Sequence, residues 1–423
     1  MNTTIDPPQI QSRIRNIAAE LSHDPVLGQI LQTQDVESFL YNGLSHLLQS
    51  ALHKDRQFYL QDHQEDCLNG FSPTRTLHLG TTPINIQIPR TRKGFYPGFL
   101  PKYQRCLGDS YQELLSDILL QAKSFQSALR TMQAMGLGYS PKQMQSLLEE
   151  LDTEAKNFFT RPLASDWLFV YLDAKVVQLK NERDQVQTAV HFLVIGVSMD
   201  ATKELLSSKI YWGNEQLECW KQLFIDLKNR GLTRVLMLLT DDFSGLTKLV
   251  QGLFPHTDHQ LCCVHLFRNA QRHLSKQDYA LFRQSWQEIY ACNDFEVARD
   301  KFQGLLDQLR EQHPAYVKHL QARLEHYLVF MHYPQEIHRH IRSTNLPEGI
   351  NNLIETLKRN AGGHFHSERE ARVKMKLLTD RLYQTKWKNS SPTMKANLAA
   401  LTQLFRQRFE PELNPQHFLT QNS

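Results

Sequence analysis

A chain of 423 residues with 41% hydrophobic and 22% charged residues has the composition of a folded protein, and its length favours two or three domains. Its formal net charge of +4 permits binding to nucleic acid without requiring it. Six cysteines at irregular spacings exclude a small disulfide-stabilised scaffold, and no apolar stretch approaches the roughly 18 residues of a membrane span. We therefore expect a cytoplasmic protein with no membrane segment.

Residues 1–108 combine a helix, a β-hairpin and a basic linker. Apolar residues at helical spacing predict a helix over 35–53, and two short alternating segments after it predict the hairpin. Arg90, Arg92 and Lys93 then open a segment that mixes positive charge with aromatic residues, a combination suited to DNA phosphates. A solvated linker whose aromatic rings hold it against the core explains the same composition equally well.

Residues 109–160 are predicted to be a helix-turn-helix DNA-binding domain. Three helices are expected, and a glycine-containing turn that ends in a Ser-Pro step joins the last two. The second helix of such a unit enters the major groove, which makes Lys142, Gln143 and Gln145 the candidate base-contacting residues. Helical hairpins also occur without DNA, and the acidic sequence EELDTEAK at the end of this helix does not favour DNA binding.

Strand-like segments begin at residue 166. Three β-branched or aromatic runs are followed by a helix, a fourth strand, a second helix and a further apolar run. This order predicts an α/β domain of the RNase H-like type, a mixed sheet with helices packed on it, over residues 161–275. We expect residues 276–340 to be an all-helical insertion, residues 341–390 the second part of the α/β domain, and residues 391–423 a C-terminal tail.

Acidic residues at three places in this region point to a metal site. Asp173 interrupts the apolar first strand, FVYLDAKVVQLK, where an unpaired carboxylate is costly to bury. Asp241 and Asp242 end the fourth strand, which neighbours the first in an RNase H-like sheet, and Glu348 begins a later helix. Adjacent carboxylates repel unless a cation lies between them, so Asp173, Asp241 and Glu348 are the candidate catalytic and metal-binding residues.

Each acid also has an ordinary structural explanation. Asp173 could accept backbone hydrogen bonds at a strand end, and Asp241 or Asp242 could initiate the turn that follows. Glu348 could complete a capping box with Asn345, three residues before it. Convergence of all three by coincidence is the weaker account. Consecutive strand residues point to opposite faces, so only one of the two adjacent aspartates can face Asp173.

Histidine and cysteine recur in the stretch HTDHQLCCVH. His256, His259, Cys262 and His265 are three residues apart, a spacing that gathers zinc ligands on one face of a helix. We expect this stretch to be a strand, whose residues alternate between faces. The sequence therefore predicts no zinc site here.

Six segments of the chain carry a family resemblance: FVYLDAK, VIGVSMDATKELL, WKQLFIDLKNRGL, LLTDDFSGL, FPHTDHQLCCVHLFRNA and STNLPEGINNLIETLKR. In order and spacing they resemble the Mutator-like transposases of bacterial insertion sequences, from about residue 70 to about residue 388. The resemblance implies a DDE transposase whose acids are Asp173, Asp241 and Glu348. The chain departs from the family at Asp242, where glycine is typical, and in the residues that flank Glu348.

The resemblance also implies cofactors and partners. DDE transposases use two Mg²⁺ ions, with Mn²⁺ as a substitute, to cleave a DNA strand and transfer it. The implied partners are the terminal inverted repeats of the element and target DNA, bound by a homodimer or higher oligomer in the bacterial cytoplasm or nucleoid. The pair Cys262 and His265, followed by Arg268 and Asn269, matches the family signature, which implies that it supports the active site or contacts DNA. A buried cysteine beside a hydrogen-bonded core histidine is the alternative. An RNase H-like nuclease or resolvase and a DNA-binding derivative without catalysis are the alternatives.

Overall fold

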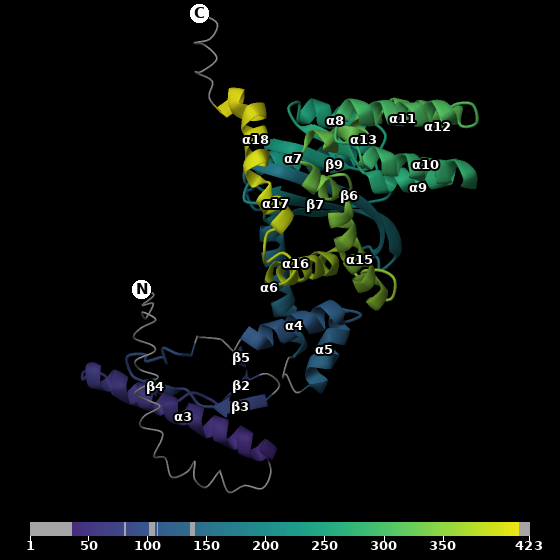
Figure 1. The fold of residues 1–423 in the computed structure, drawn as a ribbon. Helices are drawn as coiled ribbons and strands as arrows, with labels where there is room; N and C mark the ends of the chain where they lie inside the picture. Colours follow the sequence, from purple (N-terminus) through teal and green to yellow (C-terminus); the bar gives the residue numbers. More distant parts are fainter. Residues whose placement is uncertain (1–35, 80–81, 101–105, 108, 136–139, 414–423) are drawn as a thin grey trace, which may run out of the picture. The chain divides into compact units, whose positions relative to one another are not determined.

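The computed structural model describes residues 36–79, 82–100, 106–107, 109–135 and 140–413 (Figure 1). The chain divides into two compact units, residues 1–144 and residues 145–423. Each unit has a hydrophobic core of its own. Within the described residues, no helix is long and apolar enough to cross a membrane.

The first unit packs a long helix against short strands. Its strands pair as β2–β3 and β1–β4, both antiparallel, and as β2–β5, which is parallel. Leu52, Leu77 and Ile84 are buried where the helix meets the sheet. The predicted helix and hairpin are therefore confirmed, although the helix continues to Asp62. The elements are α3 (Val36–Asp62), β1 (Leu68–Phe71), β2 (Arg75–Leu79), β3 (Thr82–Ile86), β4 (Pro89–Thr91) and β5 (Cys106–Leu107).

Three helices follow, as the sequence predicts. They are α4 (Asp109–Gln121), α5 (Phe125–Ala134) and α6 (Pro141–Thr160). A capping box begins α5, because the Ser124 hydroxyl accepts a hydrogen bond from the backbone N–H of Ser127 and the Ser127 hydroxyl accepts one from Ser124. The turn before α6 lies outside the described residues. The use of these helices as a helix-turn-helix stays a prediction.

The second unit is built on a mixed five-stranded sheet, as expected. The strands are β6 (Asp166–Lys180), β7 (Val186–Ser198), β8 (Lys203–Trp212), β9 (Arg234–Thr240) and β10 (Asp258–Leu261). Their order across the sheet is β10-β9-β6-β7-β8. The first three strands in the chain pair antiparallel, whereas β9 and β10 run parallel to β6.

Helices cover both faces of this sheet. On one face, α7 (Leu217–Asn229) and α8 (Leu246–Leu253) bury Trp220 and Phe224 against strand residues such as Leu172. On the other face, Tyr171 and Leu239 belong to a second core, which continues into the helices after β10. The alternation of residues along β6 explains this division, because successive side chains point to opposite faces.

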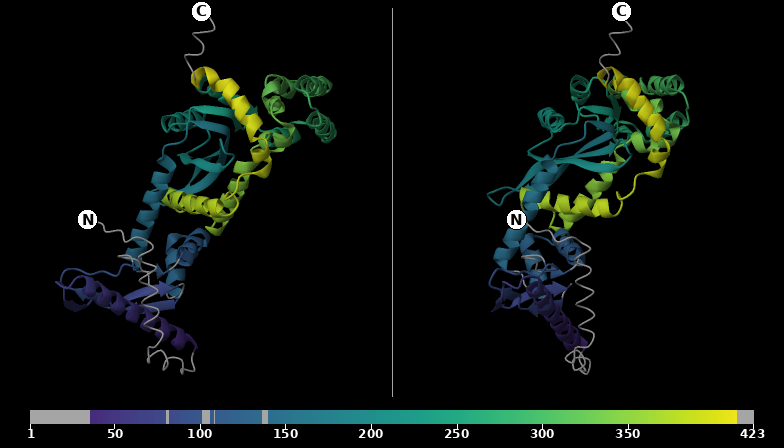
Figure 2. Two further views of the ribbon diagram at one scale, coloured as in Figure 1. Left: turned by 60° about the vertical axis from the view of Figure 1, so that its left-hand side comes forward. Right: turned by 90° about the vertical axis from the view of Figure 1, so that its left-hand side faces the viewer.

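The chain is largely helical from Cys263 to Ile341. Trp286, Phe282 and Phe302 are fully buried there and form the centre of the helical core. Two views show α10 to α12 extending away from the sheet as one bundle (Figures 1 and 2). The predicted helices of the insertion are therefore present. They are α10 (Lys276–Tyr290), α11 (Phe295–Leu309), α12 (Pro314–Gln321), α13 (Leu324–Leu328) and α14 (His338–Ile341), with two 3-10 turns between α13 and α14. A further helix, α9 (Cys263–His273), lies before the predicted range.

The last four helices complete the second unit. They are α15 (Asn345–Asn360), α16 (Glu368–Gln384), α17 (Pro392–Ala396) and α18 (Leu398–Leu413). The sequence suggested a tail from residue 391, but α18 packs on β9. It buries Phe405 and Phe409 in the same core as Tyr171 and Leu239. Arg408 strengthens the contact with an ion pair of 2.8 Å to Asp258. The apolar residues of α18 recur at helical spacing, and their burial makes the segment part of the fold.

Candidate active site

Asp173 and Asp241 lie at the same level of two neighbouring strands. β6 and β9 pair in parallel, with Tyr171 opposite Leu239. Asp173 comes two positions after Tyr171, and Asp241 comes two positions after Leu239. Tyr171 and Leu239 belong to the core on the face that the insertion covers. Because strand residues two apart share a face, both carboxylates belong to that face.

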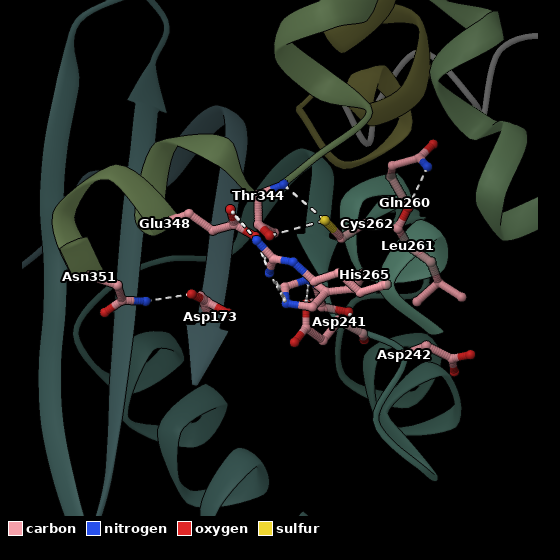
Figure 3. Close-up of polar contacts among 12 residues, drawn as sticks. Asp173, Asp241, Asp242, Gln260, Leu261, Cys262, His265, Thr344, Glu348 and Asn351 are labelled. Carbon is pink, nitrogen blue, oxygen red and sulfur yellow. Dashed lines mark hydrogen bonds and ion pairs between the residues drawn. The ribbon is translucent and has the colours of Figure 1, made fainter. Parts of the chain in front are cut away.

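The helix α15 brings two more polar side chains to this place. It packs against β6 and β7, and Glu348 and Asn351 are three residues apart, so they share one side of the helix. The amide nitrogen Nδ2 of Asn351 donates a hydrogen bond to Oδ2 of Asp173. Glu348 extends from the same helix toward His265 (Figure 3).

Burial and like charge both act on Asp173, which is only 5% exposed. Burial, followed by the negative charges of Asp241 and Glu348, raises the pKa of Asp173 to about 7, while His265 and Asn351 act in the opposite direction. The three acids predicted from the sequence therefore form one electrostatic cluster. An added cation relieves such a cluster.

His265, in the first turn of α9, binds Asp241. Its Nδ1 contacts Oδ1 of Asp241, and its Nε2 lies 3.9 Å from Oε1 of Glu348. Burial lowers the pKa of His265, but hydrogen bonds to Asp241 and Cys262 outweigh it and raise that pKa to about 10. The charged imidazolium offsets part of the negative charge of the acids.

Cys262 precedes α9 and connects three elements. Its sulfur accepts hydrogen bonds from the backbone N–H of Thr344 at 3.3 Å and from the Thr344 hydroxyl at 3.1 Å. Its own backbone N–H donates to the carbonyl of Thr240 at 2.9 Å. The end of β9, the start of α9 and the start of α15 are thereby held together around Asp241.

The prediction that HTDHQLCCVH is a strand throughout was wrong. β10 ends at Leu261 and α9 begins at Cys263, so the helical turn brings His265 back beside Cys262. Ligand atoms of Asp241, Cys262 and His265 all lie within 4.8 Å of one another. His259 lies elsewhere, buried with its Nε2 at 2.8 Å from the hydroxyl of Thr240.

Arg268 binds the third acid. Its two terminal nitrogens donate to the two oxygens of Glu348 at 2.9 and 3.1 Å, the paired geometry that arginine forms with a carboxylate. The side chain of Arg268 is 50% exposed. Glu348 does not form the capping box that was considered as an alternative. The residue before α15 is Thr344, and no side chain caps the start of this helix.

Asp242 has a different environment from Asp241. Its carboxylate is 3% exposed and accepts hydrogen bonds from Nε2 of His319 at 2.7 Å, Nε of Arg323 at 2.5 Å and the hydroxyl of Tyr327 at 3.1 Å. Burial raises the pKa of Asp242, but the bonds from His319 and Arg323 outweigh it and lower that pKa. Asp241 therefore faces the acid cluster, and Asp242 binds the insertion (Figure 3).

The basic linker has features of both interpretations offered for it. Arg90, Arg92 and Lys93 are exposed, in β4 or directly after it. The rings of Tyr96 and Phe99, in contrast, pack against the core of the first unit. The linker thus presents its charges to solvent while its aromatic residues anchor it.

The remaining predicted DNA contacts lie on helices. Lys142 and Gln145 are exposed in the first turns of α6, and the side chain of Gln143 lies outside the described part of the chain. Asn269 is half-buried on α9, next to Arg268.

Sequence reasoning missed three side chains of the site. Asn351 could have been found, because a residue three positions after Glu348 lies on the same side of a helix. Thr344 and Glu215 carry no such signal. Glu215 lies just before α7 and accepts a 2.9 Å hydrogen bond from Trp220. Burial and the charge of Asp241 raise the pKa of Glu215, whereas this hydrogen bond lowers it by a smaller amount.

A family model described as "Transposase, Mutator family" matches residues 13–390. The chain belongs to the Mutator family of transposases. The resemblance recognised in the six sequence segments is therefore confirmed, and the match covers both units of this Mutator-family chain.

Curated relatives of this Mutator-family chain are named as transposases of insertion sequences. The transposase for insertion sequence element IS905 of Lactococcus lactis is 25% identical over 342 residues, which cover 78% of this chain and 85% of the relative. The transposase for ISRM3 of Rhizobium meliloti is 25% identical over 342 residues, or 80% and 84% of the two chains. The transposase for IS1081 of Mycobacterium tuberculosis is 26% identical over 297 residues, or 69% and 71%.

Proposed function

We propose that this chain is a DNA transposase that binds the ends of its insertion sequence, cleaves a DNA strand and transfers it to target DNA by DDE chemistry. The observation that carries the proposal is the convergence of Asp173, Asp241 and Glu348, whose charges act on one another. Family membership supports the transposase activity, and this geometry supports the choice of acids.

The sheet supports an RNase H-like assignment of the second unit. Three antiparallel strands are followed by two strands parallel to the first, in the order β10-β9-β6-β7-β8. Asp173 lies on the first of these strands and Asp241 directly after the fourth, which are paired neighbours. The helical insertion then separates these two acids from Glu348 in the chain.

The three carboxylates suit Mg²⁺, with Mn²⁺ as a substitute, because both cations prefer oxygen ligands. Asp173 fits such a role, since burial and then the negative charges of Asp241 and Glu348 raise its pKa, and a bound cation relieves both effects. When bound, two such ions would supply charge neutralisation at the scissile phosphate and an activated water or 3′-hydroxyl. Asn351 orients Asp173 and His265 orients Asp241, while Arg268 fixes Glu348.

DNA recognition is assigned to three places. We expect α6 to contact the bases of the element ends, the linker after β4 to contact phosphates, and the start of α9 to contact the strand near the acids. Joining two element ends requires at least a dimer. The residues concerned are Arg90, Arg92, Lys93, Lys142, Gln143, Gln145, Arg268 and Asn269.

A strand-transfer assay tests the proposal. The purified full chain is incubated with a pre-cleaved element end, target DNA and Mg²⁺, and joined product is measured. The variants Asp173→Asn, Asp241→Asn and Glu348→Gln keep side-chain size but remove a charged ligand, and each is expected to lower the rate at least about 100-fold.

Glu355→Gln is the matched control. Glu355 lies two turns after Glu348 on α15 and pairs with Lys175 and Lys358 outside the acid cluster, so its loss is expected to change the rate only a few-fold. Cleaved DNA without joined product would identify a nuclease instead. Unchanged joining by Asp173→Asn would overturn the assignment of the acids.

A further inference from the structure

The cluster of Asp241, Cys262 and His265 combines three kinds of donor atom. A carboxylate oxygen, a sulfur and an imidazole nitrogen lie within 4.8 Å of one another. Mg²⁺ takes oxygen ligands, whereas Zn²⁺ binds sulfur, nitrogen and oxygen at about 2.0–2.3 Å. We propose that these three residues form a site for Zn²⁺ and that bound Zn²⁺ inhibits the transposase by occupying Asp241.

The backbone explains why the three donors converge. Cys262 is the residue directly before α9 and His265 lies in the first turn of that helix, so the turn brings the two side chains together. The backbone N–H of Cys262 donates to the carbonyl of Thr240, which is the residue before Asp241. The donors are therefore attached to one hydrogen-bonded junction of strand and helix. Binding of Zn²⁺ displaces the proton of the His265 imidazolium to solvent, so that a neutral imidazole nitrogen becomes the ligand.

The surroundings of the sulfur provide a second, independent observation. Thr344 directs both its backbone N–H and its hydroxyl at Sγ of Cys262. These two hydrogen bonds fix the orientation of the sulfur next to Asp241 and His265. Partners of this kind orient a metal ligand and strengthen its binding.

The site is also reachable from solvent on one side. Cys262 is 1% exposed, but the side chains of His265 and Asp241 are 24% and 27% exposed. An ion can enter from the side of the acids and keep a water as its fourth ligand, as zinc sites with three protein ligands do.

Inhibition rests on the proposed function, whereas zinc binding does not. If Asp241 serves Mg²⁺ in catalysis, it cannot give the same oxygens to an ion held by Cys262 and His265. Sulfur and nitrogen ligands favour Zn²⁺ over Mg²⁺. Low concentrations of Zn²⁺ are therefore expected to displace Mg²⁺ from this carboxylate.

Binding is tested with Co²⁺ as a coloured substitute for Zn²⁺, on the full chain without DNA. The expected result is a thiolate-to-cobalt absorption band that disappears when Zn²⁺ is added. Cys262→Ser removes the sulfur and should abolish the band. His265→Asn, at a partly exposed position where unfolding is not expected, should weaken Co²⁺ binding at least about tenfold.

Cys263→Ser is the matched control. Cys263 is the next residue and equally buried, but its sulfur lies 3.8 Å from the carbonyl of Tyr327, away from the acids. The variant Cys263→Ser should leave the cobalt absorption band unchanged. Absence of the band in the unmodified chain, or a band that survives Cys262→Ser, would overturn the zinc site.

Inhibition is then measured as strand transfer in Mg²⁺ at increasing Zn²⁺, each variant being compared with its own rate without Zn²⁺. Cys262→Ser is expected to raise the Zn²⁺ concentration for half-inhibition at least about tenfold, and Cys263→Ser to leave it unchanged. Equal inhibition of all three proteins would overturn the inhibitory role. A cobalt band in a chain that transfers no DNA strand would instead count against the proposed function alone.

Discussion

Arg323 of the helical insertion binds Asp242 at the end of β9, with its Nε 2.5 Å from Oδ1 of the aspartate. Asp242 follows Asp241 directly, so the ion pair fixes the strand end that carries the second acid. The family typically has glycine at the position of Asp242. In this chain the contact therefore couples the placement of Asp241 to the insertion.

Loss of this contact is expected to destabilise the second unit. Asp242→Asn should lower the free energy of unfolding by about 1–2 kcal/mol, because Arg323 and His319 remain partly exposed and regain water. Denaturant unfolding followed by tryptophan fluorescence measures this, since all five tryptophans lie in the second unit. In a double-mutant cycle, the combined variant of Asp242→Asn and Arg323→Gln should lose less free energy of unfolding than the sum of the two single variants.

The control for this prediction is an exposed ion pair. Lys301 lies 2.9 Å from Glu288, and both side chains are well exposed. Lys301→Gln should leave the free energy of unfolding unchanged within the error of the measurement. Full additivity of Asp242→Asn and Arg323→Gln would contradict the coupling.

Removal of Arg268 is expected to strengthen cation binding. The paired hydrogen bonds of Arg268 compete with a cation for both oxygens of Glu348, although the half-exposed arginine weakens this competition. Arg268→Gln should lower the dissociation constant for Mn²⁺ about threefold to tenfold, measured by calorimetry without DNA. Arg272→Gln, an exposed arginine one turn later on α9, should leave it unchanged. Weaker binding after Arg268→Gln would contradict the competition.

Ionisation of Asp173 should reduce the stability of the second unit as pH rises from about 4 to about 7 in the absence of divalent cations. The folded state holds the Asp173 proton up to a pKa of about 7, against 3.8 in the unfolded chain, so ionisation of Asp173 opposes folding above pH 4. Asp173→Asn should raise the free energy of unfolding at pH 8 by roughly 2–4 kcal/mol and have little effect below pH 4. Unfolding curves at both pH values measure this, and equal pH dependence of the two proteins would contradict it.

Gly196 of β7 should not tolerate a side chain. A Cβ at this position would lie 2.5 Å from a ring carbon of Trp167 and 2.8 Å from a methyl group of Leu206. Gly196→Ala is expected to lower the free energy of unfolding by about 1–3 kcal/mol through overpacking. Gly304→Ala in α11, where no atom lies within 4 Å of the added carbon, should raise it by about 0.5–1 kcal/mol. Equal effects of the two alanines would refute the packing argument.

The sequence was sufficient for the order of the elements in the second unit. Strand segments and helices differ in periodicity, and these local patterns predicted the five strands and the helices after β10. Asp173 was recognisable because a charged residue inside an apolar strand is rare. Its register with Asp241 also followed, since the first and fourth strands were expected to be neighbours and are paired.

Local patterns were not sufficient where contacts between distant segments determine the secondary structure or the packing of a segment. The stretch HTDHQLCCVH contains apolar residues typical of a strand, yet its second half begins a helix that packs on the sheet. Residues 398–413 have apolar residues at helical spacing, but this spacing alone does not show that the helix packs on β9 and joins the core, as α18 does.

The sequence by itself determined the family, the candidate acids and the strands that carry them, because each depends on residue type and spacing along the chain. Only the tertiary structure decided that Asp241 faces Asp173 and that Asp242 binds Arg323, because both aspartates are chemically identical and adjacent. It also decided that Cys262 and His265 meet at Asp241. That meeting depends on where β10 ends and on the hydrogen bonds that join it to β9 and α15.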